Sequence, residues 1–395
     1  MNYQKFDIAI IGSSYAGMTC ALALAQISPQ ISIALIEKEQ IFENARVEDG
    51  RAYAISSSSL KLFDEFSILS ELEKISGKIS DIKITDYKSP FVLDFIGAEF
   101  DKKNQQFGLI IENHFIFEAL KKRISNQKNI QIFCPNFYQE IESSLSPTIK
   151  LDNGLTIQSK LIIACDGRFS KLRQLYKIPT TIKNYHQTAI VFKIHHQISH
   201  NQVAYERFLP SGPLAILPLQ DLNQSSIVWI TNDSTASTLL DLDDENFLQQ
   251  LHKKMENCLG KCEIISRKFS YPLTMVLANK FHHQKLLLVG DSACGVHPIA
   301  GQGFNLAIAN IIILRNLISK YIMSGLDFSS DELIKNYNSK ARANSKKMVI
   351  ATDILNSIFE NSNFAVSGIR NLGLGIINSL PSIKKFFIKN AGGIE

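Results

Sequence analysis

Short apolar runs alternate with a helical pattern at the start of the chain. FDIAIIG (6–12) and ISIALIEK (31–38) are nearly continuous apolar segments, which are typical of strands buried on both faces. GMTCALALAQ (17–26) lies between them and combines helix-forming residues with apolar side chains on most faces. A strand, a turn, a helix and a second strand within about thirty residues predict a βαβ unit with a right-handed crossover. We therefore expect a parallel sheet near the N-terminus.

Shorter strand patterns follow between residues 130 and 165. They are separated by turns, and Asp152-Asn153-Gly154 is a hairpin signal. The segments are IQIFC (130–134), YQEIE (138–142), TIKL (148–151), TIQS (156–159) and LIIAC (161–165). This series predicts a meander that returns to the first sheet.

A second group of strand patterns extends from about Tyr185 to Trp229 and is broken by Pro and Gly residues. Its segments are AIVFKI (189–194), AYERFL (204–209), LAILPL (214–219) and SIVWI (226–230). They predict a second, mostly antiparallel sheet. KLLLVGD (285–291) is then another buried strand, followed by a Gly-rich turn and a long helix from Phe304 towards Tyr321.

The whole pattern predicts an α/β fold with a discontinuous Rossmann-type first domain, an inserted β-sheet domain and a helical C-terminal tail. The first domain is expected to comprise residues 1–75, 105–180 and 280–330. The inserted domain is expected to comprise residues 76–104 and 181–279, and the C-terminal region residues 331–395.

The C-terminal segment from Phe364 to Gly393 alternates small and apolar residues with basic ones. Pro381 is expected to divide it into two helices. Two interpretations stay open: the tail contacts a membrane surface, or it packs on the body of the protein or on a second subunit of a homodimer. The basic residues are Arg370, Lys384, Lys385 and Lys389.

Composition narrows the class of protein. A chain of 395 residues with 45% hydrophobic and 20% charged residues can bury a large core. The longest apolar stretch, around Phe304 to Ile318, contains Arg315, and we expect no transmembrane helix. Met1 to Lys5 lacks the apolar core of a signal peptide, which argues against export.

The net charge of +5 is spread along the chain and does not favour nucleic-acid binding.

The six cysteines are scattered and favour a reducing compartment. Cys258 and Cys262 have a metal-like spacing, but no second Cys/His pair with matching spacing lies nearby. We expect ordinary thiols and no metal site.

Three segments carry the candidate chemistry. The first, Gly12-Ser13-Ser14-Tyr15-Ala16-Gly17, stands between the first strand and its helix, where helix amides can meet a dinucleotide pyrophosphate. Glu37 ends the second strand and can accept hydrogen bonds from an adenosine ribose. Ser14 occupies the place of the usual middle glycine. A glycine turn that binds nothing is the alternative.

The second segment, LIIACDGRFSKLR, places Asp166-Gly167 after a buried strand and Arg173 shortly beyond it. A solvent-facing turn is the alternative. In the third, LLLVGDSACGVHPIAGQGFNLAIAN, Asp291 ends a strand, and the residues from Pro298 to Gly303 lead into a helix whose N-terminus can stabilise negative charge. We expect an orienting role for His297 and Pro298 rather than base catalysis.

These segments resemble the group A flavoprotein aromatic hydroxylases, and among them the ubiquinone-biosynthesis hydroxylase family. The resemblance spans nearly the whole chain, and its last motif is highly specific. It rests on GSSYAG (12–17), EDGRAYAISSSS (48–59), Asp166-Gly167, GPLAILPL (212–219) and HPIAGQGFNL (297–306). The chain departs from the family at Ser14, Ser292, Cys294 and Ala307.

The resemblance implies that FAD is the cofactor and that NAD(P)H and O2 are co-substrates. It assigns Gly12, Ser14, Gly17 and Glu37 to the ADP half of FAD, and Arg51 to a position near the pyrophosphate. Asp291 would hold the ribityl chain, and Gly301, Gln302, Gly303 and Asn305 would lie by the isoalloxazine ring. The Asp166-Gly167 motif, with Arg173, would serve both FAD and the nicotinamide nucleotide.

The implied reaction is hydroxylation of the aromatic ring of a polyprenylated phenol in ubiquinone biosynthesis. Such a substrate implies a cytoplasmic enzyme at the inner face of the membrane, or one held by proteins of a ubiquinone-biosynthesis complex. Hydroxylation of a soluble aromatic compound and a flavin-binding scaffold with weak catalysis are the alternatives. Candidate lining residues of the substrate site, each with ordinary core packing as the alternative, are Phe208, Pro210, Leu217, Pro218 and Trp229.

Overall fold

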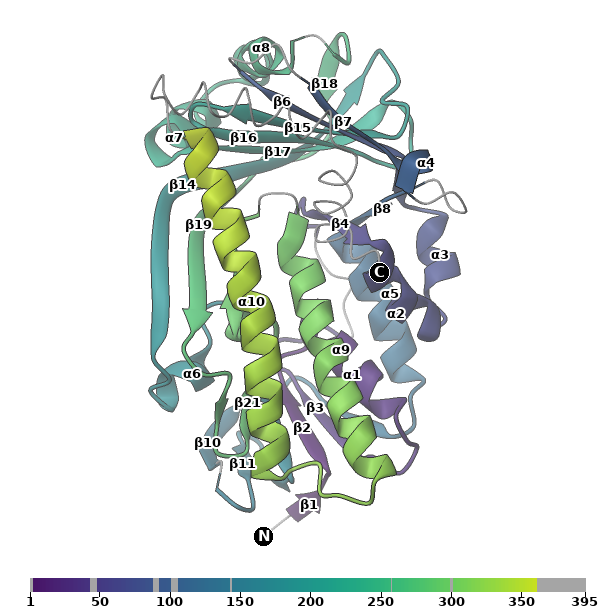
Figure 1. Ribbon diagram of the computed structural model, residues 1–395, viewed down its shortest axis with the longest axis vertical. Helices are drawn as coiled ribbons and strands as arrows, with labels where there is room; N and C mark the ends of the chain where they lie inside the picture. The colour runs from purple at the N-terminus through teal and green to yellow at the C-terminus, as the bar shows by residue number, and fades with distance from the viewer. Residues whose placement is uncertain are drawn as a thin grey trace.

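The protein is seen in a computed structural model that describes residues 3–42, 48–87, 92–100, 106–142, 144–256, 258–298 and 301–360 (Figure 1). The predicted helices of the tail beyond residue 360 lie outside the described residues. The predicted α/β class is confirmed.

A six-stranded sheet forms the base of the molecule. Its order is β20 (His282–His283), β21 (Leu286–Leu288), β13 (Leu161–Ala164), β2 (Ile8–Ile11), β3 (Ile33–Ile36) and β9 (Ile130–Phe133). All neighbours are parallel except β20 and β21. The helix α1 (Tyr15–Ala25) connects β2 to β3, as the βαβ prediction requires. Every residue of β2, β3, β13 and β21 is buried, which explains their continuous apolar pattern.

The predicted meander is only partly right. β9 and β13 join the six-stranded sheet, but the strands between them form a separate four-stranded sheet with the N-terminal strand. Its order is β1 (Tyr3–Lys5), β12 (Thr156–Gln158), β11 (Thr148–Leu151) and β10 (Tyr138–Glu142). The Asp152-Asn153-Gly154 turn joins β11 to β12 as an antiparallel hairpin. β10 has exposed residues at both odd and even positions, and β11 has an exposed residue between two buried ones. Neither pattern is that of a strand in a sheet buried on both faces.

A nine-stranded sheet lies across the other end of the molecule (Figure 1). Its neighbours are antiparallel, apart from the parallel pair of β15 and β6. The order is β22 (Cys294–Gly295), β19 (Phe269–Ala278), β14 (Thr180–His196), β17 (Gln224–Asn232), β16 (Gly212–Pro218), β15 (Val203–Leu209), β6 (Asp81–Asp86) and β7 (Val92–Ile96), with β18 (Cys262–Ile264) beside β14. The predicted second sheet is therefore present.

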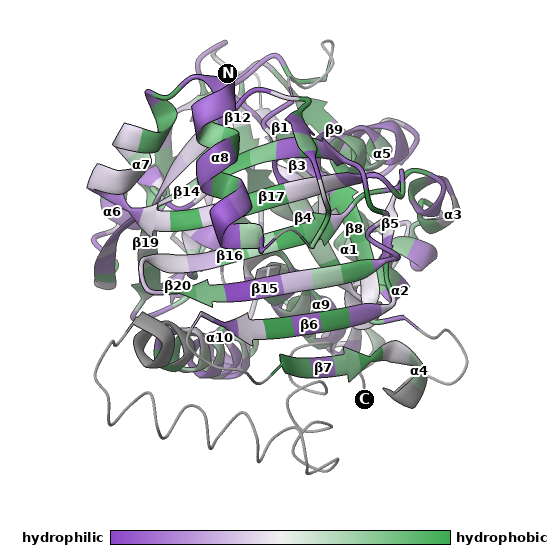
Figure 2. Ribbon diagram, turned by 90° about the horizontal axis from the view of Figure 1, so that it is seen from above, coloured by the Kyte–Doolittle hydropathy of each residue, from purple (hydrophilic) through white to green (hydrophobic). Residues whose placement is uncertain are grey.

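Helices cover the outer face of this sheet. Figure 2 shows α8 (Asp244–Met255) lying across the strands, with α7 (Asp233–Leu240) beside it. Phe247 of α8 packs edge-on against Phe192 and Trp229 of the sheet. The outer face therefore has a hydrophobic core of its own.

A three-stranded sheet stands between the two large ones and was not predicted. It consists of β4 (Ala52–Ser56), β8 (Gly108–Glu112) and β5 (Gly77–Ile79), all antiparallel. The helices nearby in sequence are α2 (Ser57–Glu65), α3 (Leu69–Glu73), α4 (Gly97–Phe100) and α5 (Asn113–Ser125).

The chain leaves the six-stranded sheet through α6 (Lys171–Leu175), which follows β13, and again through the short 3-10 helix η1 (Gly290–Ser292), which follows β21. The long helices α9 (Gln302–Met323) and α10 (Asp331–Glu360) then run side by side (Figure 1). Among the described helices, α9 alone is long and apolar enough to cross a membrane, but it packs against α1 and α10 with about half its length buried. A helix in the core of a folded protein has the same length, apolar composition and burial.

One continuous core joins the sheets. Ile10 and Ile163 of the six-stranded sheet belong to the same hydrophobic cluster as Val191, Ile230 and Met275 of the nine-stranded sheet. The domain boundaries expected from the sequence stay a prediction, because a shared core does not define them.

Candidate active site

The carboxyl ends of the parallel strands meet at one edge of the six-stranded sheet. Gly12 follows β2, Glu37 follows β3, Asp166 follows β13 by two residues, and Gly290 begins η1 just after β21. A Cβ built on Gly290 would lie 2.9 Å from the Cβ of Ala16 in α1. The three sequence segments that carry the candidate chemistry therefore converge where ligands collect in such sheets.

Two helices present open N-termini at this edge. Ser14 is the N-cap residue of α1, yet its side chain makes no capping hydrogen bond. Gly301 is the N-cap residue of α9, in a left-handed conformation with φ of 63°. Neither helix has an acidic residue in its first turn. Because the N-cap residues supply no capping hydrogen bond, the helix dipole makes both termini suitable for negatively charged groups.

Gly12 and Gly17 allow very close backbone contacts. A Cβ on Gly17 would lie 1.9 Å from the carbonyl oxygen of Gly12, and one on Gly12 would lie 2.6 Å from that of Cys165. Gly12 also has φ of +93°, which side chains rarely tolerate. These glycines let α1 start directly above the end of β2.

Glu37 is held at the end of β3 by the glycine-rich turn. Its Oε2 accepts hydrogen bonds from the backbone N–H of Ser13 at 2.8 Å and from the Ser13 hydroxyl at 3.0 Å. The carboxylate keeps a second oxygen, Oε1, which accepts a hydrogen bond from the backbone N–H of Glu39. The carboxylate is thus fixed beside the N-terminus of α1.

Arg51 lies in a loop that several elements hold in place. Its guanidinium contacts Asp49 Oδ2 at 2.5 Å, and Asn113 of α5 donates to the same oxygen at 2.7 Å. Tyr271 of β19 donates to the Asp49 carbonyl. Burial alone would raise the pKa of Asp49, but Arg51 outweighs it and holds that pKa below its usual value.

Arg173 and Asp291 are linked through Arg168, which the sequence analysis did not single out. Asp166 Oδ2 accepts from the N–H of Leu172 at the start of α6. Arg173 is buried and donates to the carbonyls of Ser292 and Arg168 at 2.8 and 2.7 Å. Arg168 lies 3.5 Å from Asp291. The Arg173 guanidinium therefore ties the two ligand-facing loops together.

His297 is buried just before the start of α9. Its Nε2 lies 3.1 Å from Gln187 Oε1, and the ring of Tyr185 packs on it edge to face. Burial lowers the pKa of His297 to about 4, so the ring is neutral near pH 7. The orienting function of His297 and Pro298 stays a prediction. Residues 299 and 300, which follow Pro298, lie outside the described residues.

Gln302, Gly303 and Asn305 occupy the first turn of α9. Asn305 Oδ1 accepts from the N–H of Ser56 and the hydroxyl of Ser59, and its Nδ2 donates to the carbonyl of Ala54. The side chain of Asn305 therefore fastens the start of α9 to the junction of β4 and α2.

An aromatic cluster also lies here and was missed by the sequence reading. Tyr15 of α1 stacks on Phe304 of α9 with ring centroids 4.5 Å apart, and Tyr53 of β4 lies 4.9 Å from Phe304. These residues stand next to recognised motifs, but only the folded chain brings the three elements together.

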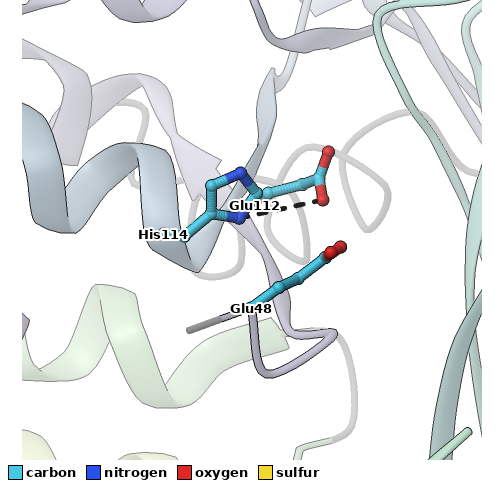
Figure 3. Close-up of side chains that lie close together, drawn as sticks. All are labelled: Glu48, Glu112 and His114. Carbon is cyan, nitrogen blue, oxygen red and sulfur yellow. Dashed lines mark ion pairs between the residues drawn. The ribbon is translucent and has the colours of Figure 1, made fainter. Parts of the chain in front are cut away.

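Glu48, Glu112 and His114 form a group that resembles a metal site (Figure 3). Lys193 of β14 lies 2.6 Å from Glu48 and 3.0 Å from Glu112. The ammonium group therefore already lies between the two carboxylates and offsets part of their charge, and we assign no metal to them. Cys258 and Cys262 are free thiols.

The candidate lining residues divide between the faces of the nine-stranded sheet. Leu217 packs against the cluster on the inner face, which contacts the three-stranded sheet. Trp229 lies in the outer core beside α8. Phe208 and Pro218 are buried in the sheet, and Pro210 is exposed in the turn between β15 and β16.

A parallel sheet whose carboxyl edge meets a glycine-rich turn and an open helix N-terminus defines a dinucleotide-binding protein. Residues 5–352 match the family described as FAD binding domain. Ubiquinone hydroxylase UbiL of Rhodospirillum rubrum is 32% identical over 389 residues, which cover 98% of this chain and 89% of that protein. Ubiquinone hydroxylase UbiM of Neisseria meningitidis is 26% identical, with 98% and 84% covered.

Solved structures give the same fold. The p-nitrophenol 4-monooxygenase PnpA from Pseudomonas putida has a TM-score of 0.79 at 15% identity, with 100% of both chains covered. The chain belongs to the FAD-dependent monooxygenase family, and its relatives include ubiquinone hydroxylases. Its cofactor is therefore FAD, with NAD(P)H and O2 as co-substrates.

The residues at the sheet edge fit this cofactor. The N-termini of α1 and α9 lack capping side chains. Asp166 Oδ1 is buried and has no hydrogen-bond partner among the described residues. A Cβ on Gly167 would meet nothing within 4 Å. Among the described residues, a buried acceptor without a partner and the open space beside Gly167 therefore lie together where a dinucleotide needs them.

Proposed function

We propose that this monooxygenase hydroxylates the aromatic ring of a polyprenylated phenol in ubiquinone biosynthesis. The observation that carries the proposal is the similarity to ubiquinone hydroxylases over 98% of the chain. The apolar inner face of the nine-stranded sheet, with Leu217, Ala204 and Ile84, supports a substrate ring that is itself apolar.

The residues at the carboxyl edge of the six-stranded sheet are proposed to bind the cofactor. The open N-terminus of α1 binds the pyrophosphate and Glu37 the adenosine ribose, while the N-terminus of α9 stabilises negative charge beside the flavin ring. Bound FAD supplies the redox chemistry that couples NAD(P)H oxidation to hydroxylation by O2. Besides Glu37, the residues proposed to contact it are Gly12, Ser14, Gly17, Arg51, Asp166, Gly167, Arg173, Asp291, Gly301, Gln302, Gly303 and Asn305.

The protein's own contribution is orientation and exclusion of water. Asn305 fastens α9 to β4, and Arg173 ties the Asp166 loop to the Asp291 loop. Neutral His297 holds the turn before α9 against Gln187 without adding a charge. In this scheme no side chain acts as a metal ligand.

Asp291 offers a direct test of the cofactor assignment. Asp291→Ala is expected to lower the FAD content of the purified protein, measured by its absorbance spectrum, because a hydrogen-bonding carboxylate is lost at the edge. Asp331→Ala, which removes an exposed partner of Lys285 on α10, is the control and is expected to keep full FAD content. Equal FAD content in both variants contradicts the assignment.

Quinone-lipid mass spectrometry of cells that lack the protein tests the substrate. Accumulation of a prenylated phenol short of one ring oxygen supports the proposal and identifies the ring position. Normal ubiquinone, together with a bound flavin in the purified protein, contradicts it and favours hydroxylation of a soluble aromatic compound. Bound flavin without NAD(P)H oxidation favours a scaffold.

We also propose that the enzyme works in the cytoplasm at the inner face of the membrane. A polyprenyl chain is too apolar to travel free in water, so the substrate must be collected from a bilayer or from a partner protein. The basic tail with Lys384 and Lys385, which lies outside the described residues, is the proposed contact. Flotation of the full chain with anionic but not neutral vesicles is expected; no flotation with either contradicts the proposal.

A further inference from the structure

A single carboxylate interrupts an apolar row on the inner face of the nine-stranded sheet. Residues paired across neighbouring strands lie side by side on one face. The row of paired residues is Val191 (β14), Val228 (β17), Ala215 (β16), Glu206 (β15), Ile84 (β6) and Leu93 (β7). Figure 2 shows the corresponding hydrophilic segment within β15. A charged group in the middle of such a row is costly unless it has a partner.

The neighbouring charge of β15 points the other way. Arg207 follows Glu206, and successive side chains of a strand alternate between faces. Arg207 contacts Glu256 at 2.5 Å and donates to the carbonyl of Met255 at the end of α8, on the outer face. Arg207 therefore does not neutralise Glu206.

No other described residue neutralises the charge of Glu206. Glu206 has no hydrogen-bond or ion-pair partner among the described residues. Lys193 shares the inner face but is paired with Glu48 and Glu112. Burial raises the pKa of Glu206 to about 7, although part of the residue stays accessible to solvent. The carboxyl group of Glu206 is therefore enclosed by protein but still accessible, and a ligand can donate a hydrogen bond to it.

The inner face connects Glu206 to the start of α9. Ala204, two residues before Glu206 on the same face, belongs to the cluster that Ala54 of β4 also packs against. A Cβ on Gly301, the N-cap residue of α9, would lie 3.2 Å from the Cβ of Ala54. Two small side chains, Ala204 and Ala54, therefore lie between β15 and the start of α9, where the flavin ring is proposed to bind.

We propose that Glu206 orients the substrate by accepting a hydrogen bond from the hydroxyl group of a neutral phenol, and that it disfavours rings carrying an ionised carboxylate. The inference rests on the proposed function and specifies its substrate class. The apolar row contacts the ring, and the phenol O–H supplies the donor that the carboxylate lacks. Above pH 7, where Glu206 is ionised, a carboxylate on the ring would bring a second negative charge and no donor.

The test compares three probes on the FAD-loaded full chain at about pH 8.5, above the pKa of Glu206: 2-geranylphenol, its methyl ether and 3-geranyl-4-hydroxybenzoate. Binding is followed by the change in flavin absorbance, and turnover by NAD(P)H oxidation and product. A hydrogen bond to a charged group corresponds to roughly a 10- to 100-fold difference in affinity. The wild-type protein is expected to prefer the phenol over its ether by about this factor. Glu206→Ala is expected to bring the ratio close to one, and Glu206→Asp to restore part of it.

Glu206→Gln keeps the shape of the side chain without the charge. It is expected to improve binding of 3-geranyl-4-hydroxybenzoate by roughly tenfold, because a repulsive charge is removed. Glu263→Gln, at an exposed position on β18 of the same sheet, is the matched control and should change none of these ratios. FAD content shows whether each variant is folded.

The outcomes separate the inference from the proposed function. If the wild-type protein hydroxylates 2-geranylphenol but Glu206→Ala keeps its preference over the ether, or weakens both probes equally, Glu206 is not the orienting residue. If the wild-type protein neither binds nor hydroxylates any of the probes, the proposed function itself is wrong and the inference falls with it.

Discussion

Gly17 and Gly303 both lie in first turns of helices but have very different surroundings. A Cβ on Gly17 would lie 1.9 Å from the backbone oxygen of Gly12, whereas the nearest atom to a Cβ on Gly303 is 3.7 Å away. Gly17→Ala must push α1 off β2 and is expected to lower the free energy of unfolding by about 3 kcal/mol or more. Gly303→Ala is the control and is expected to cost less than about 0.5 kcal/mol, since Ala favours helices. Urea unfolding measures both, and similar losses would show that α1 can shift freely.

His297 gives the protein a pH-dependent stability. Its pKa of about 4 lies below the ordinary value of 6.5 because burial disfavours the charged ring. As pH falls below 6.5 the unfolded chain takes up this proton first, so the free energy of unfolding decreases until about pH 4 is reached. The full effect is on the order of 3 kcal/mol.

The measurement is urea unfolding between pH 4 and 7, with wild type compared with His297→Asn. The variant has no titrating ring at this position, so its stability should depend less steeply on pH in this window. Parallel profiles for the two proteins would mean that His297 is not responsible.

The sequence predicts a site residue most directly when the residue belongs to one short motif of the chain. Gly12 and Glu37 follow buried strands and Gly17 lies in the first turn of the helix between them, so the pattern of one βαβ unit predicts where all three stand. The pairing of Arg168 with Asp291 and of Asn305 with Ser56 joins segments that are far apart in the chain. Glu206 likewise stands out only once strand pairing shows its apolar neighbours.

At the scale of elements, the loop that carries Arg51 depends on β14. Lys193 lies between Glu48 and Glu112. Burial alone would lower the pKa of Lys193, but its hydrogen bonds to the carboxylates outweigh burial and raise that pKa. Lys193→Met leaves two carboxylates facing each other without a cation. It is expected to cost about 2 kcal/mol of stability and to speed FAD release.

Lys122→Met is the control for this prediction. Lys122 pairs with Glu71 where both side chains are more than half exposed, and such surface pairs contribute about 0.5 kcal/mol. Chemical unfolding and the rate of FAD loss after dilution measure both variants. An equally small effect at Lys193 would show that solvent replaces its charge.

Elements with a strong pattern were predicted and weaker ones were not. The buried parallel strands, the Asp152-Asn153-Gly154 hairpin and the strands of the second sheet all follow from apolar runs between turn residues. The sheet of β4, β8 and β5 joins segments from residues 52–56, 77–79 and 108–112. Short strands with distant partners leave no periodic signal, and whether β10 joins one sheet or another depends on tertiary packing.

At the scale of the molecule, the two large sheets are expected to unfold together. β14 and β17 place Val191 and Ile230 in the main core, and Phe192 and Trp229 in the outer core beside α8. Because the same strands supply both cores, neither core can lose its packing without exposing the other. The inserted position of the second sheet in the sequence therefore does not make it an independent folding unit.

Trp229 makes this prediction measurable, because it is the single tryptophan of the chain and reports on the outer core. Its fluorescence and the far-ultraviolet circular dichroism of the FAD-loaded protein should give the same urea midpoint. Phe247→Leu, which loosens the contact between α8 and Trp229, should lower both midpoints equally. If fluorescence changes at lower urea than circular dichroism, the outer core unfolds separately, and the shared strands do not couple the two cores.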